Sequence, residues 1–355
     1  MSVYDILNSS FIKWMDVPEG DRDIVISSRV RLARNLGEIP FPHLLDQITG
    51  SKSLELISHA WKNTPGPLLA DMDMIALDQL SPLDRQILTE KHLSSPQHAD
   101  ATCAYRAILV NHDGSLAAMV NEEDHLRMQC LLPGIRLREC YATAQALDDE
   151  FEYNLDYAFD EERGYLTACP TNVGTGLRAS VMVHLPAMQM SGQLNHVLQN
   201  IGQLGMAVRG LYGEGSQPVG NFYQISNQVT LGQTEEDICT YLQTVTEQIV
   251  EQEGLLRERL KTDLKYQLED KIGRAYGILC NARVIASDEA LSLLSDVRLG
   301  VDLGILTGIS LLALNELMVA IRPAHLQKLG GREMDAIERD IKRAEVIQAK
   351  MTSVK

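Results

Sequence analysis

The spacing of hydrophobic residues changes near residue 255, and this change constrains the fold more than any other feature of the 355-residue chain. Before it, segments such as 125–132 and 177–185 alternate in the two-residue period of a half-buried β-strand. After it, an aliphatic residue recurs every four positions, the spacing of one helix face, at Leu256, Leu260, Leu264, Leu268 and Ile272. We therefore predict an α+β domain over residues 1–254, with a largely antiparallel β-sheet flanked by helices, and an all-helical domain over residues 255–355.

The same patterns predict individual elements. Strands are expected at 102–111, 115–121, 125–132 and 177–185, and a strand pair at 222–230. Helices are expected at 192–209, at 335–349 and at 234–253, where Thr234 suits the N-cap position. The first 100 or so residues, which are punctuated by proline, are predicted to form short helices and loops.

Charge and composition exclude several classes of protein. A formal net charge of −16 argues against a nucleic-acid partner, although a few arginines in a cleft can still form an anion site. The six cysteines show no CxxC pair and no zinc-like spacing, which predicts reduced thiols and no metal centre. There is no continuous apolar run at the N-terminus and no apolar segment long enough for a membrane span, so we expect a cytoplasmic protein without a membrane partner.

Five arginines fall on predicted strand faces or loops rather than on exposed helices: Arg29, Arg31, Arg127, Arg178 and Arg209. Two carboxylates, Glu123 and Glu214, fall on turns near them. Phosphoryl transfer needs this combination, because cations hold the triphosphate while carboxylates orient the nucleophile. Taken singly, each motif also fits an ordinary surface turn, surface strand or helix C-terminal loop. The sequence lacks GxxxxGK[ST], HRD and DFG motifs, which excludes P-loop and ordinary protein-kinase chemistry.

Segments 27–34, 121–127, 169–178 and 209–216, followed by 223–228, resemble the signatures of phosphagen kinases such as creatine and arginine kinases, in content and in order. The resemblance covers about residues 20–250 and implies a phosphagen-kinase-like catalytic domain that uses ATP and Mg²⁺. It implies a nucleotide site made of Ser27, Ser28, Arg29, Val30, Arg31, His92, Arg127, Arg178, Ala179, Ser180, Val181, Met182, Arg209, Gly210, Leu211, Tyr212 and Gly213. It also implies that Glu123 and Glu214 clamp the guanidinium, with Cys169 beside it. Glu123 is the expected base, and a packed thiol explains Cys169 equally well.

In two features this sequence differs from the phosphagen kinases that act on small guanidines. Phosphagen kinases for small guanidines carry a helical domain before the Ser-Ser-Arg motif, whereas here 26 residues precede Ser27 and a helical segment follows residue 255. Tyr212 stands where arginine kinases have another arginine, which puts one phosphate contact in question. In these respects the chain is similar to bacterial protein-arginine kinases, whose open cleft admits an arginine on a polypeptide. Their RDxxRA motif is matched by Arg339, Asp340, Ile341, Lys342, Arg343 and Ala344.

This resemblance implies an enzyme that transfers the γ-phosphoryl group of ATP to protein arginines. Phosphoarginine would bind the RDxxRA motif and activate the enzyme allosterically, although the pattern alone also fits a solvated helix with salt bridges. Implied partners are arginine-bearing proteins, among them stress-response repressors, a zinc-binding activator, the Clp ATPase and protease system, and further copies of the chain in a homo-oligomer. Two alternatives stay open: a kinase for free arginine, and a non-catalytic adaptor that binds phosphoarginine.

Overall fold

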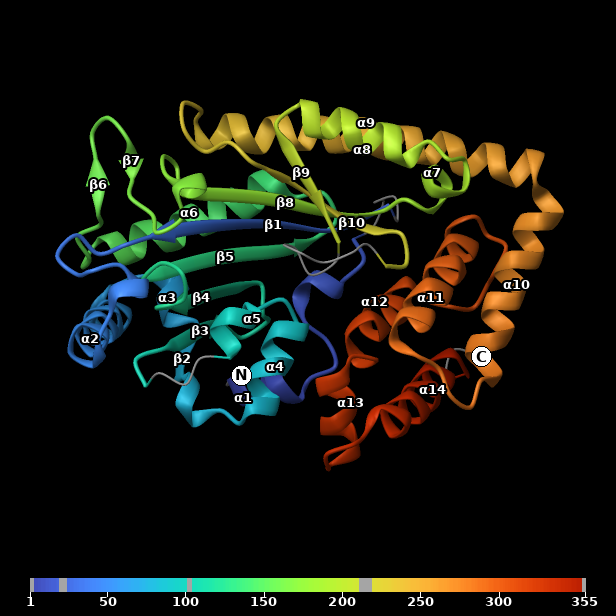
Figure 1. The fold of residues 1–355 in the computed structure, drawn as a ribbon, viewed down its shortest axis with the longest axis horizontal. Helices are drawn as coiled ribbons and strands as arrows, with labels where there is room; N and C mark the ends of the chain where they lie inside the picture. The colour runs from blue at the N-terminus through green and yellow to red at the C-terminus, as the bar shows by residue number, and fades with distance from the viewer. Residues whose placement is uncertain (1–2, 19–23, 101–103, 211–218, 353–355) are drawn as a thin grey trace.

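The computed structural model describes residues 3–18, 24–100, 104–210 and 219–352. Its centre is an eight-stranded antiparallel sheet in the order β2-β3-β4-β5-β1-β8-β10-β9 (Figure 1). The strands are β1 Val25–Arg34, β2 Met72–Ala76, β3 Ala107–Asn111, β4 Leu116–Val120, β5 Leu126–Pro133, β8 Leu177–His184, β9 Met206–Arg209 and β10 Phe222–Asn227. A separate two-stranded hairpin consists of β6 Phe159–Asp160 and β7 Gly164–Tyr165. This arrangement confirms the predicted α+β class.

Helices cover the sheet and make up the C-terminal part of the chain. Those within the sheet region are α1 Val3–Asn8, α2 Gln47–Asn63, α3 Pro67–Ala70, α4 Pro82–Glu90, α5 Pro96–Ala99, α6 Leu137–Glu152, α7 Pro186–Met190, α8 Leu194–Gln203 and α9 Glu235–Asp263. The C-terminal helices, which we call the helical region, are α10 Lys265–Asn281, α11 Ser287–Asp302, α12 Leu311–Ala320, α13 Pro323–Gly330 and α14 Ala336–Thr352. Short 3₁₀ turns are η1 Lys13–Met15, η2 Pro42–Leu44, η3 Leu77–Gln79 and η4 Pro170–Asn172. Helix α9 runs through residues 254 and 255, so the chain enters the helical region without a break.

The two faces of the sheet differ because successive residues of a strand point to opposite sides. On one face, apolar side chains such as Val30, Met128 and Val181 are fully buried in the larger core, where they pack with side chains of α6 and α9. On the other face, the apolar residues Leu131 and Met182 belong to a second core that includes side chains of α1, α4 and α12. The centre of that second face carries polar side chains, which form the candidate site.

Several sequence-based expectations are wrong in their details. The first 100 residues contain the ten-residue strand β1 at the centre of the sheet, as well as β2 and the 17-residue helix α2. The helix expected at 192–209 ends at Gln203, because Gly205 adopts a positive φ of 74° and Met206–Arg209 then pairs with β10. The strand pair expected at 222–230 is one strand, whose partners β8 and β9 come from elsewhere.

The strands expected at 115–121, 125–132 and 177–185 are confirmed within a few residues. The strand expected at 102–111 begins only at Ala107, and the helix expected at 234–253 continues to Asp263. Thr234 caps α9 by accepting a hydrogen bond from the Asp237 N–H, as its position suggested. The described C-terminal residues beyond α9 form helices and no strands, and the predicted helix at 335–349 is α14. Within the described parts of the chain, no helix combines the length and the apolar character that a membrane-spanning segment needs.

Candidate active site

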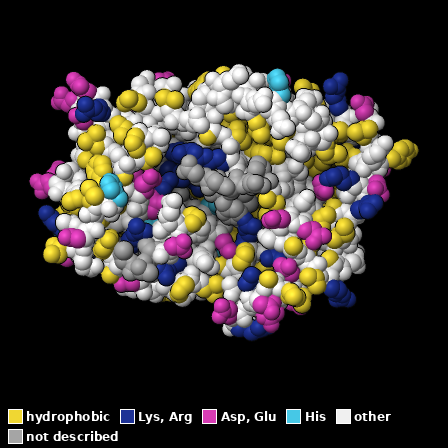
Figure 2. Space-filling model, in the orientation of Figure 1, with side chains coloured by type: hydrophobic (Ala, Val, Ile, Leu, Met, Phe, Trp, Pro, Cys, Tyr) yellow, Lys and Arg dark blue, Asp and Glu magenta, His cyan; other side chains and the backbone are white. Residues whose placement is uncertain are grey.

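Four of the five predicted arginines point to one face at the centre of the sheet. Arg29 and Arg31 are two residues apart on β1, and Arg31 lies directly opposite Arg178 of β8 and Gln129 of β5. Arg127 is two residues from Gln129 and therefore projects to the same side. Figure 2 shows lysine and arginine side chains gathered near the middle of the molecular face in view. The register of three strands thus brings these guanidinium groups together.

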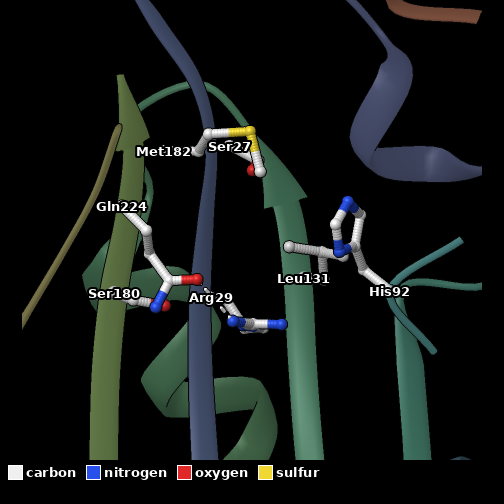
Figure 3. Close-up of a pocket in the computed structure, with 7 residues that line it drawn as sticks. All are labelled: Ser27, Arg29, His92, Leu131, Ser180, Met182 and Gln224. Atoms are coloured by element: carbon white, nitrogen blue, oxygen red, sulfur yellow. Dashed lines mark hydrogen bonds between the residues drawn. The ribbon is translucent and has the colours of Figure 1, made fainter. Parts of the chain in front are cut away.

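A small pocket lies at one end of this arginine cluster. It is lined by Ser27, Arg29, His92, Leu131, Ser180, Met182 and Gln224 (Figure 3). Arg29 Nη2 donates a 2.8 Å hydrogen bond to Gln224 Oε1, which fixes the guanidinium beside the pocket. Arg209, at the end of β9, pairs with Gln224 in the sheet and places a fifth arginine beyond it.

The crowding of positive charge perturbs the arginines themselves. Burial, together with the charges of Arg127 and Arg178, lowers the pKa of Arg29 to about 10. Burial and the neighbouring guanidinium groups also hold the pKa of Arg31 well below its usual value. The buried Nε atom of Arg31 has no hydrogen-bond partner. A multivalent anion would both offset these charges and accept hydrogen bonds, so a polyphosphate fits the cluster.

One buried carboxylate partly compensates the cluster. Glu122 accepts hydrogen bonds from Arg127 Nη1 at 2.7 Å, Ser95 Oγ at 2.6 Å and the Glu123 N–H at 3.0 Å. Burial alone would raise the pKa of Glu122, but the charge of Arg127 and these hydrogen bonds lower it to about 2. In return, the charge of Glu122 outweighs the effect of burial and raises the pKa of Arg127. Glu122 therefore stays ionised and holds Arg127 in place.

Glu123, the predicted base, differs from its neighbour. Its side chain is 40% exposed and reaches to within 3.8 Å of Arg127 Nη1, whereas the side chain of Glu122 is 1% exposed. A carboxylate in this position is accessible to a substrate and still lies beside the arginine cluster. Of the two adjacent acids, Glu122 therefore supports the site, and Glu123 is accessible to a substrate.

Asp124 connects this acidic turn to the loop that carries Cys169. Its Oδ1 atom accepts hydrogen bonds from Asn35 Nδ2 at 2.6 Å and from the Ala168 N–H at 2.7 Å. The thiol of Cys169 is partly accessible and lies 3.0 Å from Thr171 Oγ1. Burial raises the pKa of Asp124 above its usual value, despite those hydrogen bonds. Asp124 is therefore the link that holds the Glu123 turn and the Cys169 loop together.

His92 occupies the pocket wall in an unusual backbone conformation. It follows α4 with a φ of +63°, which non-glycine residues seldom adopt, and its carbonyl accepts a 2.7 Å hydrogen bond from Gln129 Nε2. Its ring packs edge-on against Trp14, with 5.5 Å between ring centroids. Burial and the charges of Arg29 and Arg322 lower the pKa of His92 to about 3. The ring is therefore neutral at physiological pH.

Not every predicted site residue faces the pocket. The side chains of Val30, Ala179 and Val181 lie in the larger hydrophobic core. Ser28 also points away, and its hydroxyl donates to Gly134 O at 2.8 Å. Gly210 directly follows β9 and is buried. The predicted residues Leu211, Tyr212, Gly213 and Glu214 lie outside the described part of the chain, so their roles stay predictions.

The RDxxRA segment of α14 divides into buried and accessible residues. Arg343 is 2% exposed, and its guanidinium donates to the carbonyls of Ile321 and Ile285 and to Asp340. Ala344 is buried in the core of the helical region. Arg339, which donates to Met334 O at 2.8 Å, is half-buried, as are Asp340 and Lys342, and Ile341 is 40% exposed. Arg343 and Ala344 therefore stabilise the helical region, whereas Arg339 to Lys342 are at least partly accessible.

Glu122, Asp124, Asn35 and Gln224 were missed as site residues. The signal for three of them was present, because Glu122 and Asp124 flank Glu123 in the acidic turn and Gln224 lies in the quoted segment 223–228. What the sequence lacks is the direction in which each side chain points.

Comparisons with known proteins agree with this geometry. Residues 54–256 match the family model described as "ATP:guanido phosphotransferase, C-terminal catalytic domain", and residues 265–355 match "Protein-arginine kinase McsB C-terminal domain". The solved structure of a duplicated taurocyamine kinase from Schistosoma mansoni shares 28% identity at a TM-score of 0.58, over 70% of this chain and 36% of that chain. A lombricine kinase structure has a TM-score of 0.59 over 71% of this chain and 73% of that chain, and its 23% identity supports the fold alone. Fold and sequence thus define an ATP:guanido phosphotransferase.

Curated relatives narrow the class further. A protein-arginine kinase of Syntrophomonas wolfei subsp. wolfei is 58% identical over 99% of this chain and 98% of its own length. A protein-arginine kinase of Halothermothrix orenii is 48% identical over 99% of both chains. This chain belongs to the protein-arginine kinase family.

Proposed function

We propose that this chain transfers the γ-phosphoryl group of ATP to the guanidinium group of arginine side chains in other proteins. The observation that carries the proposal is the cluster of Arg29, Arg31, Arg127 and Arg178 beside the accessible carboxylate of Glu123. Cations on the sheet suit the triphosphate, and a carboxylate at their edge suits a cationic acceptor. The similarity of this chain to protein-arginine kinases supports the same activity.

In this mechanism, the arginines bind the phosphates of ATP, which supplies the phosphoryl group. Glu122 keeps Arg127 ionised and oriented, and Gln224 orients Arg29 by accepting its hydrogen bond. Mg²⁺ would enter with the nucleotide, since phosphate oxygens are its usual ligands. Within the described residues, no group of three or more His, Cys, Asp or Glu side chains could hold a metal ion.

Glu123 would orient the acceptor arginine and accept its proton as the N–P bond forms. A guanidinium is protonated at physiological pH, so it becomes nucleophilic only as a base removes that proton. Cys169 would lie beside the guanidinium, because Asp124 ties its loop to the turn of Glu123. Glu214 would clamp the opposite edge of the acceptor.

The family resemblance supports finer proposals. Phosphoarginine would bind the accessible part of the RDxxRA segment, around Arg339 and Asp340, and would activate the kinase. The phosphorylated proteins, among them stress-response repressors, would pass to a Clp-type degradation system. A zinc-binding activator protein and a homo-oligomeric assembly complete the proposed partners.

The decisive experiment is mass spectrometry of a protein substrate after incubation with Mg–ATP, with non-acidic handling because the N–P bond is acid-labile. We expect phosphoarginine on the protein and little product from free arginine. Preferred phosphorylation of free arginine would favour a small-guanidine kinase. ATP-independent binding of phosphoarginine without turnover would favour an adaptor.

Glu123→Gln tests the base within this proposal. It should lower turnover by about 10²–10⁴-fold, because general-base catalysis contributes that much. ADP affinity should change little. The control is Glu162→Gln, the same substitution at an exposed residue of the turn between β6 and β7. Near-normal turnover of the Glu123 variant would remove Glu123 from the mechanism.

A further inference from the structure

The pocket wall that contains His92 is joined to the helical region through α4. Figure 1 shows α13 lying beside α4. His92 comes two residues after Glu90, the last residue of α4. Any contact that fixes the end of α4 therefore also bears on the position of His92.

Glu90 makes that contact with the first turn of α13. Its Oε1 atom accepts a 2.8 Å hydrogen bond from the Ala324 N–H. Its Oε2 atom accepts from the His325 N–H at 3.1 Å and lies 2.7 Å from His325 Nδ1. The carboxylate thus caps α13 with both oxygens, a favourable place for a negative charge.

Hydrophobic packing joins the same parts of the molecule. Leu131 and Met182 line the pocket, and they belong to one buried cluster with Met318 and Val319 of α12 and Ala324 of α13. The charge of Arg322, the N-cap residue of α13, is also among the causes that lower the pKa of His92, after burial and Arg29. The Glu90 contacts, this packing and the charge of Arg322 therefore all relate α13 to the pocket, and the packing also includes α12.

The contacts continue from α13 to α14. The guanidinium of Arg343 donates to Ile321 O at 2.9 Å, one residue before Arg322. A continuous set of contacts hence leads from the RDxxRA segment through the start of α13 and Glu90 to His92. Packed side chains and hydrogen bonds of this kind can carry a coupling between two sites.

We propose that Glu90 is a positioning residue for the nucleotide pocket, tying His92 to the first turn of α13 so that ATP affinity depends on the docking of the helical region. The inference rests on the proposed function, because it assigns the pocket to ATP. Glu90 itself lines no part of the pocket and touches no reacting atom. It acts through the end of α4.

The test compares three variants of the full chain. Glu90→Ala removes both oxygens, whereas Glu90→Gln keeps an acceptor for the Ala324 N–H and should partly rescue. Lys328→Met is the matched control, because Lys328 Nζ forms a 2.8 Å ion pair with Asp84 between the same two helices, in the first turn of α4 rather than at its last residue. Each variant is measured for ADP affinity by calorimetry, for kcat and KM toward ATP, and for thermal stability.

We expect Glu90→Ala to raise the Kd for ADP and the KM for ATP by about 5- to 20-fold, within the usual range of coupling between sites. The kcat at saturating ATP should change less than about threefold, since the arginines and Glu123 are untouched. Lys328→Met should leave the Kd within about twofold even where it lowers the melting temperature. A Kd that is unchanged in Glu90→Ala, or that rises equally in both variants, would overturn the proposal.

A measurement on the wild type keeps the test independent of how well the variants fold. Binding of ADP should slow hydrogen exchange at the Ala324 and His325 amides, which Glu90 holds, because coupling is reciprocal. Unchanged exchange at both amides would count against the proposal. ADP affinity needs no arginine acceptor, so failure to phosphorylate protein arginines would refute the proposed function without deciding this one.

Discussion

Replacing Glu122 with glutamine tests the electrostatic balance of the arginine cluster. The substitution keeps the size of the side chain but removes the negative charge that pairs with Arg127, whose Nη1 atom lies 2.7 Å from Glu122 Oε2. The pKa of Glu122 is lowered from its ordinary 4.5 to about 2, against the effect of burial, chiefly by the charge of Arg127. One pKa unit corresponds to about 1.4 kcal/mol, so the ionised form contributes about 3 kcal/mol to folding. We expect Glu122→Gln to lower the free energy of unfolding by about that amount at pH 7.

The pH dependence of this difference follows from the direction of the shift. A carboxyl whose folded pKa is lowered stabilises the protein above its unfolded pKa, and the contribution is lost as the pH falls through the folded value. The advantage of the wild type should therefore be complete above about pH 5 and should shrink between pH 4.5 and about 2. The glutamine variant carries no charge at any pH and provides the baseline.

Urea unfolding followed by circular dichroism at several pH values measures both effects. Glu139→Gln is the matched control, because Glu139 pairs with Arg136 at 3.3 Å on the surface, where the two side chains are 57% and 40% exposed. Such exposed pairs contribute little, so this variant should resemble the wild type. Equal stability of wild type and Glu122→Gln at pH 7, or a difference that persists unchanged at pH 3, would refute the reasoning.

Three further predictions address other parts of the site. Arg178→Ala should weaken ADP binding by about 10- to 100-fold while the chain stays folded, as calorimetry and circular dichroism can show, because a hydrogen bond to a charged group contributes about 1.5–3 kcal/mol. Asp124→Ala should raise the KM for the protein acceptor more than the KM for ATP, whereas Asp124→Asn, which keeps an acceptor for the Ala168 N–H, should retain most activity. Arg343→Met should lower the free energy of unfolding by about 2–4 kcal/mol, as measured in urea, since it leaves two carbonyls unpaired, and Arg339→Met should cost less.

Much of the fold could be predicted from the sequence because its strands alternate cleanly. Strand β8, with apolar residues at every second position, was found to within one residue. Strand β1 was hidden inside a segment predicted as helices and loops, although it is the centre of the sheet. Strand β9 was predicted as the end of the helix at 192–209, because the apolar residues Met206, Ala207 and Val208 suit a helix as well as a strand. Only the partner strand β10 and the turn at Gly205 decide between the two.

The site could be predicted in part for a similar reason. Residues two apart on a strand share a face, so Arg29 and Arg31 point together once their segment is extended, as it is in β1. That Arg178 lies opposite Arg31 depends on the register of β1 and β8, which the sequence does not encode locally. The two acids of the turn are equivalent in sequence, and only packing against Ser95 and Arg127 turns Glu122 inward.

Without nucleotide, the arginine cluster at the centre of the sheet carries more positive charge than its neighbouring carboxylate balances. Arg31 and Arg178 are direct cross-strand neighbours, an arrangement that is destabilising for like charges. Glu122 compensates only part of this repulsion, because after burial the charges of neighbouring arginines still contribute to lowering the pKa values of Arg29 and Arg31. Nucleotide phosphates would relieve the remainder, so binding and folding stability should rise together. Because the Glu122→Gln variant has more repulsion to relieve, ADP should raise its free energy of unfolding by more than it does for the wild type.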